Sequence, residues 1–238
     1  MFKGKDENII TVGFFGQSGA GKSTVIKSIP SKIGQNPVMK RLDIIRMLFA
    51  NNPNRYSNPM EFIKNKEVIM NEPNPGSSIA HMYDKYIKSQ RQLMNDFSTE
   101  VYETTKLSYP TKTYMFFDRC PLDFYTLTEC GLTRIQQEFG GKFNKNHNFD
   151  RENIKTTAIM NTDNFFDYVF IIEPWLDKNT NELNDGVRDQ YLSDHYTGEN
   201  WYGKIKGIKT EKTKFFHIDS SINTIDERVR YVTNVLGR

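Results

Sequence analysis

Gly16-Gln-Ser-Gly-Ala-Gly-Lys-Ser23 matches the pattern G-x-x-x-x-G-K-[ST] in full and stands between the apolar run Ile9–Phe15 and the helical start Thr24-Val-Ile-Lys27. An apolar run of this length that ends at glycine predicts a buried strand. The glycines allow the backbone to curl until its N–H groups point inward, a geometry that binds phosphate oxygens. The strand and helix stand in the order that a phosphate-binding loop requires, which favours this interpretation over an ordinary glycine-rich turn.

This glycine-rich loop, residues 16–23, also carries the side chains that a nucleoside triphosphate requires. Lys22 is placed to reach the β- and γ-phosphates, and the Ser23 hydroxyl is placed to ligate magnesium. We therefore expect ATP and Mg²⁺ as the cofactors of this chain. The residues expected to hold ATP are Gly16, Gln17, Ser18, Gly19, Ala20, Gly21, Lys22, Ser23 and Thr24.

Further apolar runs predict the other strands of a buried parallel sheet. They are Thr113–Phe117, Tyr168–Ile172, Lys214–Ile218 and, more weakly, Pro37–Leu42. Helices are expected between the strands, among them Thr24–Ser28, Ile44–Ala50, Ser77–Lys106 and Thr224–Leu236. Strands that alternate with helices form right-handed βαβ units. We therefore expect one α/β domain over residues 1–238, a doubly wound five-stranded parallel sheet with an acceptor-side insertion at about 51–107 and a lid at about 175–212.

The bulk composition excludes several classes of protein. The 238 residues are 37% hydrophobic and 13% aromatic, which is too apolar for extended disorder and sufficient for a packed core. The net charge of +3 does not demand a polyanionic partner. Cys120, Cys130 and the four histidines lack metal-ligand spacing. No apolar run approaches the roughly 20 residues that cross a bilayer, and no secretory signal is recognised, so we expect a cytoplasmic protein without a membrane partner.

A second candidate site lies at the end of the run Thr113–Phe117. Asp118 follows it directly, where parallel strands place their ligand-binding groups, and a carboxylate there suits magnesium. Arg119 comes next and is placed to bind an acceptor and to take part in catalysis. The pair resembles the Asp-Arg or Glu-Arg motif of thymidylate and deoxynucleoside kinases, although here it continues Cys-Pro-Leu-Asp123, unlike those families. The alternative is a surface ion pair at a strand end.

A third candidate site follows the weak strand Pro37–Leu42. Asp43 and Arg46 are three residues apart, which places both side chains near one face of a first helical turn. Asp43 is placed to accept the proton of an acceptor hydroxyl, and Arg46 to bind acceptor phosphate. The spacing resembles the Asp-x-x-Arg of polynucleotide 5′-hydroxyl kinases. The alternative is an acidic helix cap followed by a surface arginine.

Two more residues are candidates by resemblance. Asn184-Asp-Gly-Val-Arg188 resembles the lids of small P-loop ATPases and nicotinamide- or nucleoside-kinase-like proteins, in which an arginine closes over the ATP phosphates. Arg188 is accordingly a candidate catalytic residue, the alternative being a loop arginine in solvent. Gln90 lies on the apolar face of the long predicted helix, where deoxynucleoside kinases use a glutamine to bind a base edge. It equally suits a hydrogen bond to a neighbouring backbone group.

Over most of its length the chain is similar to P-loop kinases of the nucleoside and nucleotide type, with the motifs in the same order. The resemblance implies ATP- and Mg²⁺-dependent transfer of the γ-phosphoryl group to a nucleoside or nucleotide. One alternative is a kinase that acts on nucleic acid, at a 5′-hydroxyl end or at a hydroxymethylated pyrimidine in DNA, as certain phage enzymes do. Another is a regulatory P-loop ATPase without an acceptor, in which Asp43 has no role.

Overall fold

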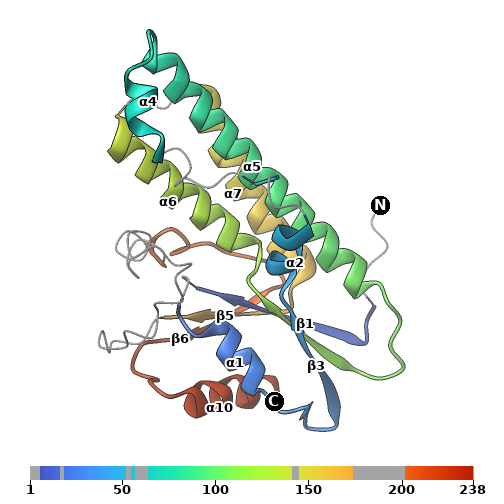
Figure 1. The fold of residues 1–238 in the computed structure, drawn as a ribbon. Helices are drawn as coiled ribbons and strands as arrows, with labels where there is room; N and C mark the ends of the chain where they lie inside the picture. The colour runs from blue at the N-terminus through green and yellow to red at the C-terminus, as the bar shows by residue number, and fades with distance from the viewer. Residues whose placement is uncertain are drawn as a thin grey trace.

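A computed structural model of the chain describes residues 6–16, 19–51, 55–56, 64–140, 145–173 and 202–237. It is an α/β structure with a six-stranded sheet of order β2-β3-β4-β1-β5-β6 (Figure 1). The strands are β1 (Ile9–Phe15), β2 (Lys32–Ile33), β3 (Asn36–Leu42), β4 (Thr113–Asp118), β5 (Tyr168–Ile172) and β6 (Lys214–Ile218). The helices in the described ranges are α1 (Lys22–Ser28), α2 (Ile44–Asn51), α4 (Lys66–Met70), α5 (Pro75–Thr105), α6 (Pro121–Phe139), α7 (Lys145–Phe165) and α10 (Ile225–Leu236).

The sheet is mixed rather than wholly parallel. Strands β3, β4, β1, β5 and β6 run parallel, whereas β2 pairs antiparallel with β3. The five predicted strands are therefore present, but the prediction of a five-stranded, all-parallel sheet was wrong because it omitted β2. This strand has only two residues and is followed by a turn in which Gly34 has a φ of 60°. So short a strand gives no apolar period by which a sequence could reveal it.

Strand β1 lies at the centre of the sheet because both of its faces are apolar. Val12 and Phe14 pack on one side with residues of α1 and α10. Ile9 and Phe15 belong to the core on the other side, together with residues of α2, α5, α6 and α7. Figure 1 shows the two layers, with α1 and α10 below the sheet and the long helices above it. The carboxyl end of β1 thus emerges between two packed layers.

The long helices α5, α6 and α7 pack together and extend beyond the sheet (Figure 1). Tyr86 of α5 is buried, and its hydroxyl donates a hydrogen bond to the carbonyl oxygen of Leu127 at 2.9 Å. The ring occupies the space beside Gly131 of α6, where an added Cβ would lie 2.1 Å from the Tyr86 hydroxyl oxygen. The close approach of α5 to α6 therefore depends on glycine at position 131.

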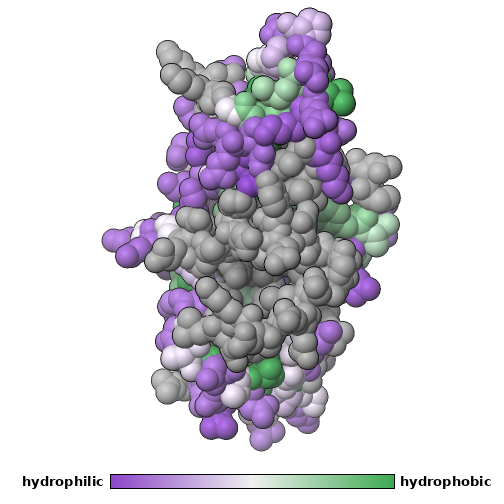
Figure 2. Space-filling view, turned by 60° about the vertical axis from the view of Figure 1, so that its left-hand side comes forward, coloured by the Kyte–Doolittle hydropathy of each residue, from purple (hydrophilic) through white to green (hydrophobic). Residues whose placement is uncertain are grey.

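The described residues visible in Figure 2 are mainly polar. On the face shown in Figure 2, hydrophilic residues predominate at both ends of the molecule, and apolar residues form small separate groups. Val68 and Phe149 are the most exposed of the large apolar side chains in the described ranges, at 67% and 70%. None of the described helices combines the length and the apolar character needed to cross a membrane.

Candidate functional site

The candidate residues at the carboxyl end of β1 lie where open α/β sheets bind ligands. The glycine-rich loop joins β1 to α1, and its glycines take up backbone conformations that L-residues avoid. Gly19 and Gly21 have φ values of 85° and 86°, and Gly16 has a φ of 156°. Gln17 and Ser18, which the sequence also predicts to contact ATP, lie outside the described residues.

Lys22 and Ser23 open α1 and point to different partners. The Lys22 side chain is only 5% exposed, and its Nζ donates a hydrogen bond to the carbonyl oxygen of Gly16 at 2.7 Å. The Ser23 hydroxyl donates to the Asp118 carboxylate at the end of β4. Hydroxyl and carboxylate oxygens are hard ligands of the kind that Mg²⁺ prefers, so Ser23 and Asp118 could hold this ion. No group of three or more His, Cys, Asp or Glu side chains that could hold a metal occurs in the described part of the chain, so the pair Ser23 and Asp118 is not such a group.

Arg119 occupies a strained bend between β4 and α6. Its φ is 99°, a positive value found at no other non-glycine residue in the described ranges. Its N–H donates to the carbonyl oxygen of Phe14 at 3.1 Å, so the bend is attached to β1 near the start of the glycine-rich loop. Backbone strain of this kind costs about 1–3 kcal/mol and persists only where surrounding contacts impose it.

Asp123 supplies those contacts, and it is a residue that the sequence analysis missed. Its side chain is fully buried, with one oxygen accepting the Cys120 N–H at 2.9 Å. The other oxygen accepts both the Gly16 N–H and Arg119 Nη1, each at 3.3 Å. Burial raises the pKa of Asp123, and the nearby charges of Arg119 and Lys22 oppose that rise. Pro121 and an acid three residues after Cys120 are a capping signal that marks Asp123 as the start of a helix, although not its link to the loop.

Arg228 of α10 holds the other side of the glycine-rich loop and was also missed. The residue is fully buried, and its Nη1 donates to the carbonyl oxygen of Ala20 at 3.0 Å. Its Nε donates to the carbonyl oxygen of Ile222, after β6, at 2.7 Å. Burial lowers the pKa of this guanidinium, and the negative charge of Glu173 acts in the opposite direction. Arg228 thus ties the loop to the last strand and helix of the described chain.

Polar residues also meet at the carboxyl ends of β5 and β6. Glu173 accepts the Ser220 N–H at 3.0 Å and pairs with His217 Nε2 at 2.9 Å. The Tyr202 hydroxyl donates to the carbonyl oxygen of Ile172, the last residue of β5. The Tyr202 ring centroid also lies 6.0 Å from that of His217. Arg188, the predicted lid arginine, lies outside the described residues.

Asp43 and Arg46 lie at the carboxyl end of β3, the strand next to β4. Both are exposed, and the Asp43 carboxylate accepts the Arg46 N–H at 3.1 Å, which caps α2. Gln90 is 6% exposed within the packed part of α5. The structure therefore brings Lys22, Ser23, Asp118 and Arg119 to one place, with Asp43 and Arg46 on the neighbouring strand end and Gln90 within the helical layer.

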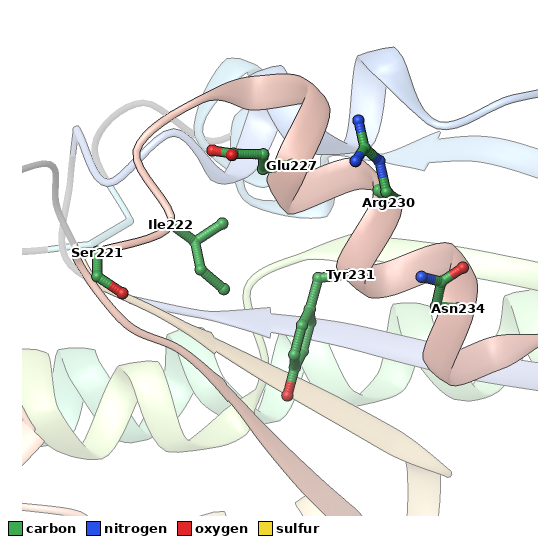
Figure 3. Close-up of a pocket in the computed structure, with 6 residues that line it drawn as sticks. All are labelled: Ser221, Ile222, Glu227, Arg230, Tyr231 and Asn234. Carbon is green, nitrogen blue, oxygen red and sulfur yellow. The ribbon is translucent and has the colours of Figure 1, made fainter.

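A shallow pocket of about 310 Å³ lies between α10 and the segment after β6 (Figure 3). Its lining residues are Ser221, Ile222, Glu227, Arg230, Tyr231 and Asn234. None of the residues of the glycine-rich loop, and none of those predicted to hold magnesium or an acceptor, lines it. The pocket is therefore separate from the candidate site, although Ile222 contributes its carbonyl oxygen to Arg228 of that site.

No known protein-family model matches the chain, and a search of curated proteins also finds no match.

Proposed function

We propose that the chain is a P-loop phosphotransferase, an ATP- and Mg²⁺-dependent kinase. The observation that carries this proposal is the hydrogen bond between the Ser23 hydroxyl and the Asp118 carboxylate. It joins the end of the G-x-x-x-x-G-K-[ST] pattern to a carboxylate at the end of the neighbouring strand, the two protein ligands that P-loop enzymes use for Mg²⁺. The positive φ values of Gly19 and Gly21 support the same proposal, because a loop needs such values to turn its N–H groups toward a phosphate.

The residues of the site divide the work of phosphoryl transfer. Lys22, at the start of α1, neutralises charge on the transferred phosphoryl group, and Ser23 and Asp118 hold Mg²⁺, which offsets the negative charge of the phosphates. Arg119 binds the acceptor side of the transferred group. Asp43, exposed at the end of β3, orients or deprotonates the acceptor hydroxyl. Such a site acts by positioning and charge neutralisation, without a covalent intermediate.

A nucleoside or nucleotide is the proposed acceptor. The support is the similarity of the Asp118-Arg119 pair to thymidylate and deoxynucleoside kinases, together with the position of Arg119 at the loop, where it shares an oxygen of Asp123 with the Gly16 N–H. A guanidinium beside a phosphate site suits a phosphorylated or hydroxyl-bearing acceptor.

The test is transfer of label from γ-³²P-ATP with Mg²⁺ to separate pools of nucleosides, nucleoside monophosphates, 5′-hydroxyl oligonucleotides and hydroxymethyluracil-containing DNA. We expect label in the nucleoside or nucleotide pool. Asp118→Asn should lower the rate by at least about 100-fold, and Asp43→Asn should also lower it. Asp226→Asn, which changes an exposed carboxylate in the first turn of α10, is the matched control and should transfer label normally.

The same assay separates the alternatives. Label that appears only in an oligonucleotide or DNA pool would replace the proposed acceptor with a nucleic acid. Slow phosphate release that Asp43→Asn does not alter, with no pool labelled, would contradict a kinase and indicate a regulatory ATPase.

A further inference from the structure

The buried carboxylate of Asp123 has more bonds than helix capping requires. One of its oxygens accepts the Cys120 N–H and so caps α6. The second oxygen takes no part in that cap, and instead accepts from Gly16 and from Arg119. Burial of a carboxylate is unfavourable unless its partners compensate, and a neutral side chain caps a helix as well. The second oxygen therefore indicates a role beyond the stability of α6.

The partners of that second oxygen come from the two segments that form the site. Gly16 opens the glycine-rich loop at the end of β1, and Arg119 follows Asp118 at the end of β4. The Arg119 N–H is bonded in turn to Phe14, two residues before the loop. Arg119 has a strained φ and its side chain contacts Asp123, in a bond that engages Nη1 of a group that carries five N–H donors. One oxygen atom thus links the phosphate side of the site to the arginine.

We propose that Asp123 is a positioning residue, whose buried carboxylate holds the Arg119 guanidinium and the Gly16 end of the loop in register before a nucleotide binds. The proposal rests on the proposed function for the identity of the ligand, ATP with Mg²⁺. Groups that are already oriented lose less freedom on binding and respond more strongly to a phosphate than groups that must be rearranged. The carboxylate also offsets the charges of Arg119 and Lys22, which would otherwise repel each other at the loop.

The experiment is a double-mutant cycle on the affinity for ATP with Mg²⁺, measured by calorimetry on the full chain. The variants are Asp123→Asn, Arg119→Met and the two combined. Asp123→Asn keeps the shape of the side chain and removes its charge. We expect each single variant to weaken ATP binding by about tenfold. The double variant should bind ATP no less tightly than the single variant with the lower affinity, because the two residues act through one contact.

Hydrogen–deuterium exchange of the peptide that carries the glycine-rich loop provides a second measurement that does not depend on activity. Without nucleotide, Asp123→Asn should increase exchange in this peptide. Asp167→Asn is the matched control. Asp167 directly precedes β5 and accepts the N–H of Thr11, a residue of β1 that lies before the glycine-rich loop, at 2.7 Å. This control should lower the melting temperature without changing loop exchange or the affinity for ATP.

Three results would overturn the proposal. The first is additive losses of ATP affinity in the double-mutant cycle. The second is an Asp123→Asn variant that binds ATP as tightly as wild type or more tightly. The third is an Asp123→Asn variant that differs from wild type only in its melting temperature. If Asp123→Asn does not fold, Arg119→Met alone decides, since unchanged loop exchange and affinity in that variant would contradict the link. A wild type that binds ATP and labels no acceptor, while the cycle is non-additive, would refute the proposed function and leave the role of Asp123 supported.

Discussion

Replacement of Gly16 with alanine tests whether the glycine-rich loop is held in place by the sheet. An added Cβ would lie 2.5 Å from the carbonyl oxygen of Ile172, the last residue of β5. That oxygen is backbone and also accepts the Tyr202 hydroxyl, so it has little freedom to move. The Gly16 N–H is fixed from another direction by its bond to Asp123.

The expected loss of stability has two parts. The φ of 156° at Gly16 is unfavourable for a side chain and costs about 1–2 kcal/mol. The contact of the added Cβ with the Ile172 carbonyl oxygen forces the loop or β5 to move by at least about 0.5 Å in a packed region. This movement costs roughly a further 1–3 kcal/mol. We therefore expect Gly16→Ala to lower the free energy of unfolding by about 2–5 kcal/mol. ATP affinity should also fall, because the displacement moves the N–H that Asp123 holds.

The assay is urea unfolding followed by far-ultraviolet circular dichroism, with ATP and Mg²⁺ affinity measured on the folded variant. Gly34→Ala is the control, since Gly34 has a φ of 60° but no atom within 4 Å of the position of its added Cβ. It isolates the backbone term and should cost about 1 kcal/mol. A Gly16→Ala variant no less stable than Gly34→Ala would refute the inference that Ile172 confines the loop.

Three further predictions concern packing and charge away from the loop. Gly131→Ala should destabilise the fold by about 1–3 kcal/mol, because its Cβ would meet the Tyr86 hydroxyl, and a urea midpoint equal to that of wild type would contradict this. Burial disfavours ionised Asp163, but the N–H groups of residues 211–213 outweigh burial and lower its pKa. The stability that ionised Asp163 contributes is therefore complete above the pKa of the unfolded chain and is lost as the pH falls below about 4. Asp163→Asn should cost about 1 kcal/mol of unfolding free energy at pH 7 and less in acid. Equal losses at both pH values would argue against this role of Asp163. Arg151→Met should lower the free energy of unfolding by about 2–3 kcal/mol, because the guanidinium binds both oxygens of the buried Glu129 carboxylate, at 2.8 and 2.6 Å. Adding Glu129→Gln to this variant should recover part of the lost stability. Strictly additive losses in thermal unfolding would exclude the pairing.

The sheet could be predicted from the sequence because buried strands carry continuous apolar runs. The predicted bounds of β1, β5 and β6 agree with the structure, and β3 and β4 differ from prediction by one residue. Each of these runs ends at a polar residue or glycine, which marks the strand end without further information. The same logic placed Asp118 directly after the run Thr113–Phe117, and the structure joins its carboxylate to the Ser23 hydroxyl at the start of α1 by a hydrogen bond.

The helices α6 and α7 were not individually predicted, and the reason is the way they are buried. Residues on all sides of α6 are buried, polar ones such as Thr128 and Glu129 included, so no single apolar stripe distinguishes the helix. The chain of α7 is rich in Asn, Asp and Thr and has no clear stripe. In both helices, packing against neighbours overrides the weak local signal.

The two residues that fix the glycine-rich loop could not be identified from local sequence. Asp123 lies 107 positions from Gly16, and Arg228 lies 208 positions from Ala20. No spacing rule links residues so distant, because their meeting depends on the complete arrangement of strands and helices. A buried charge whose partner lies across the fold is found only when the fold is known.

The central position of β1 also sets the order in which the site can be assembled during synthesis. The ribosome makes β1 before both of its neighbours, β4 and β5, and before Arg228, which lies 208 positions beyond Ala20. At about 5–20 residues per second, the interval between Ala20 and Arg228 is roughly 10–40 s. A nascent chain that ends before α10 lacks the guanidinium that holds Ala20, so the glycine-rich loop reaches its final geometry only after translation has passed that helix.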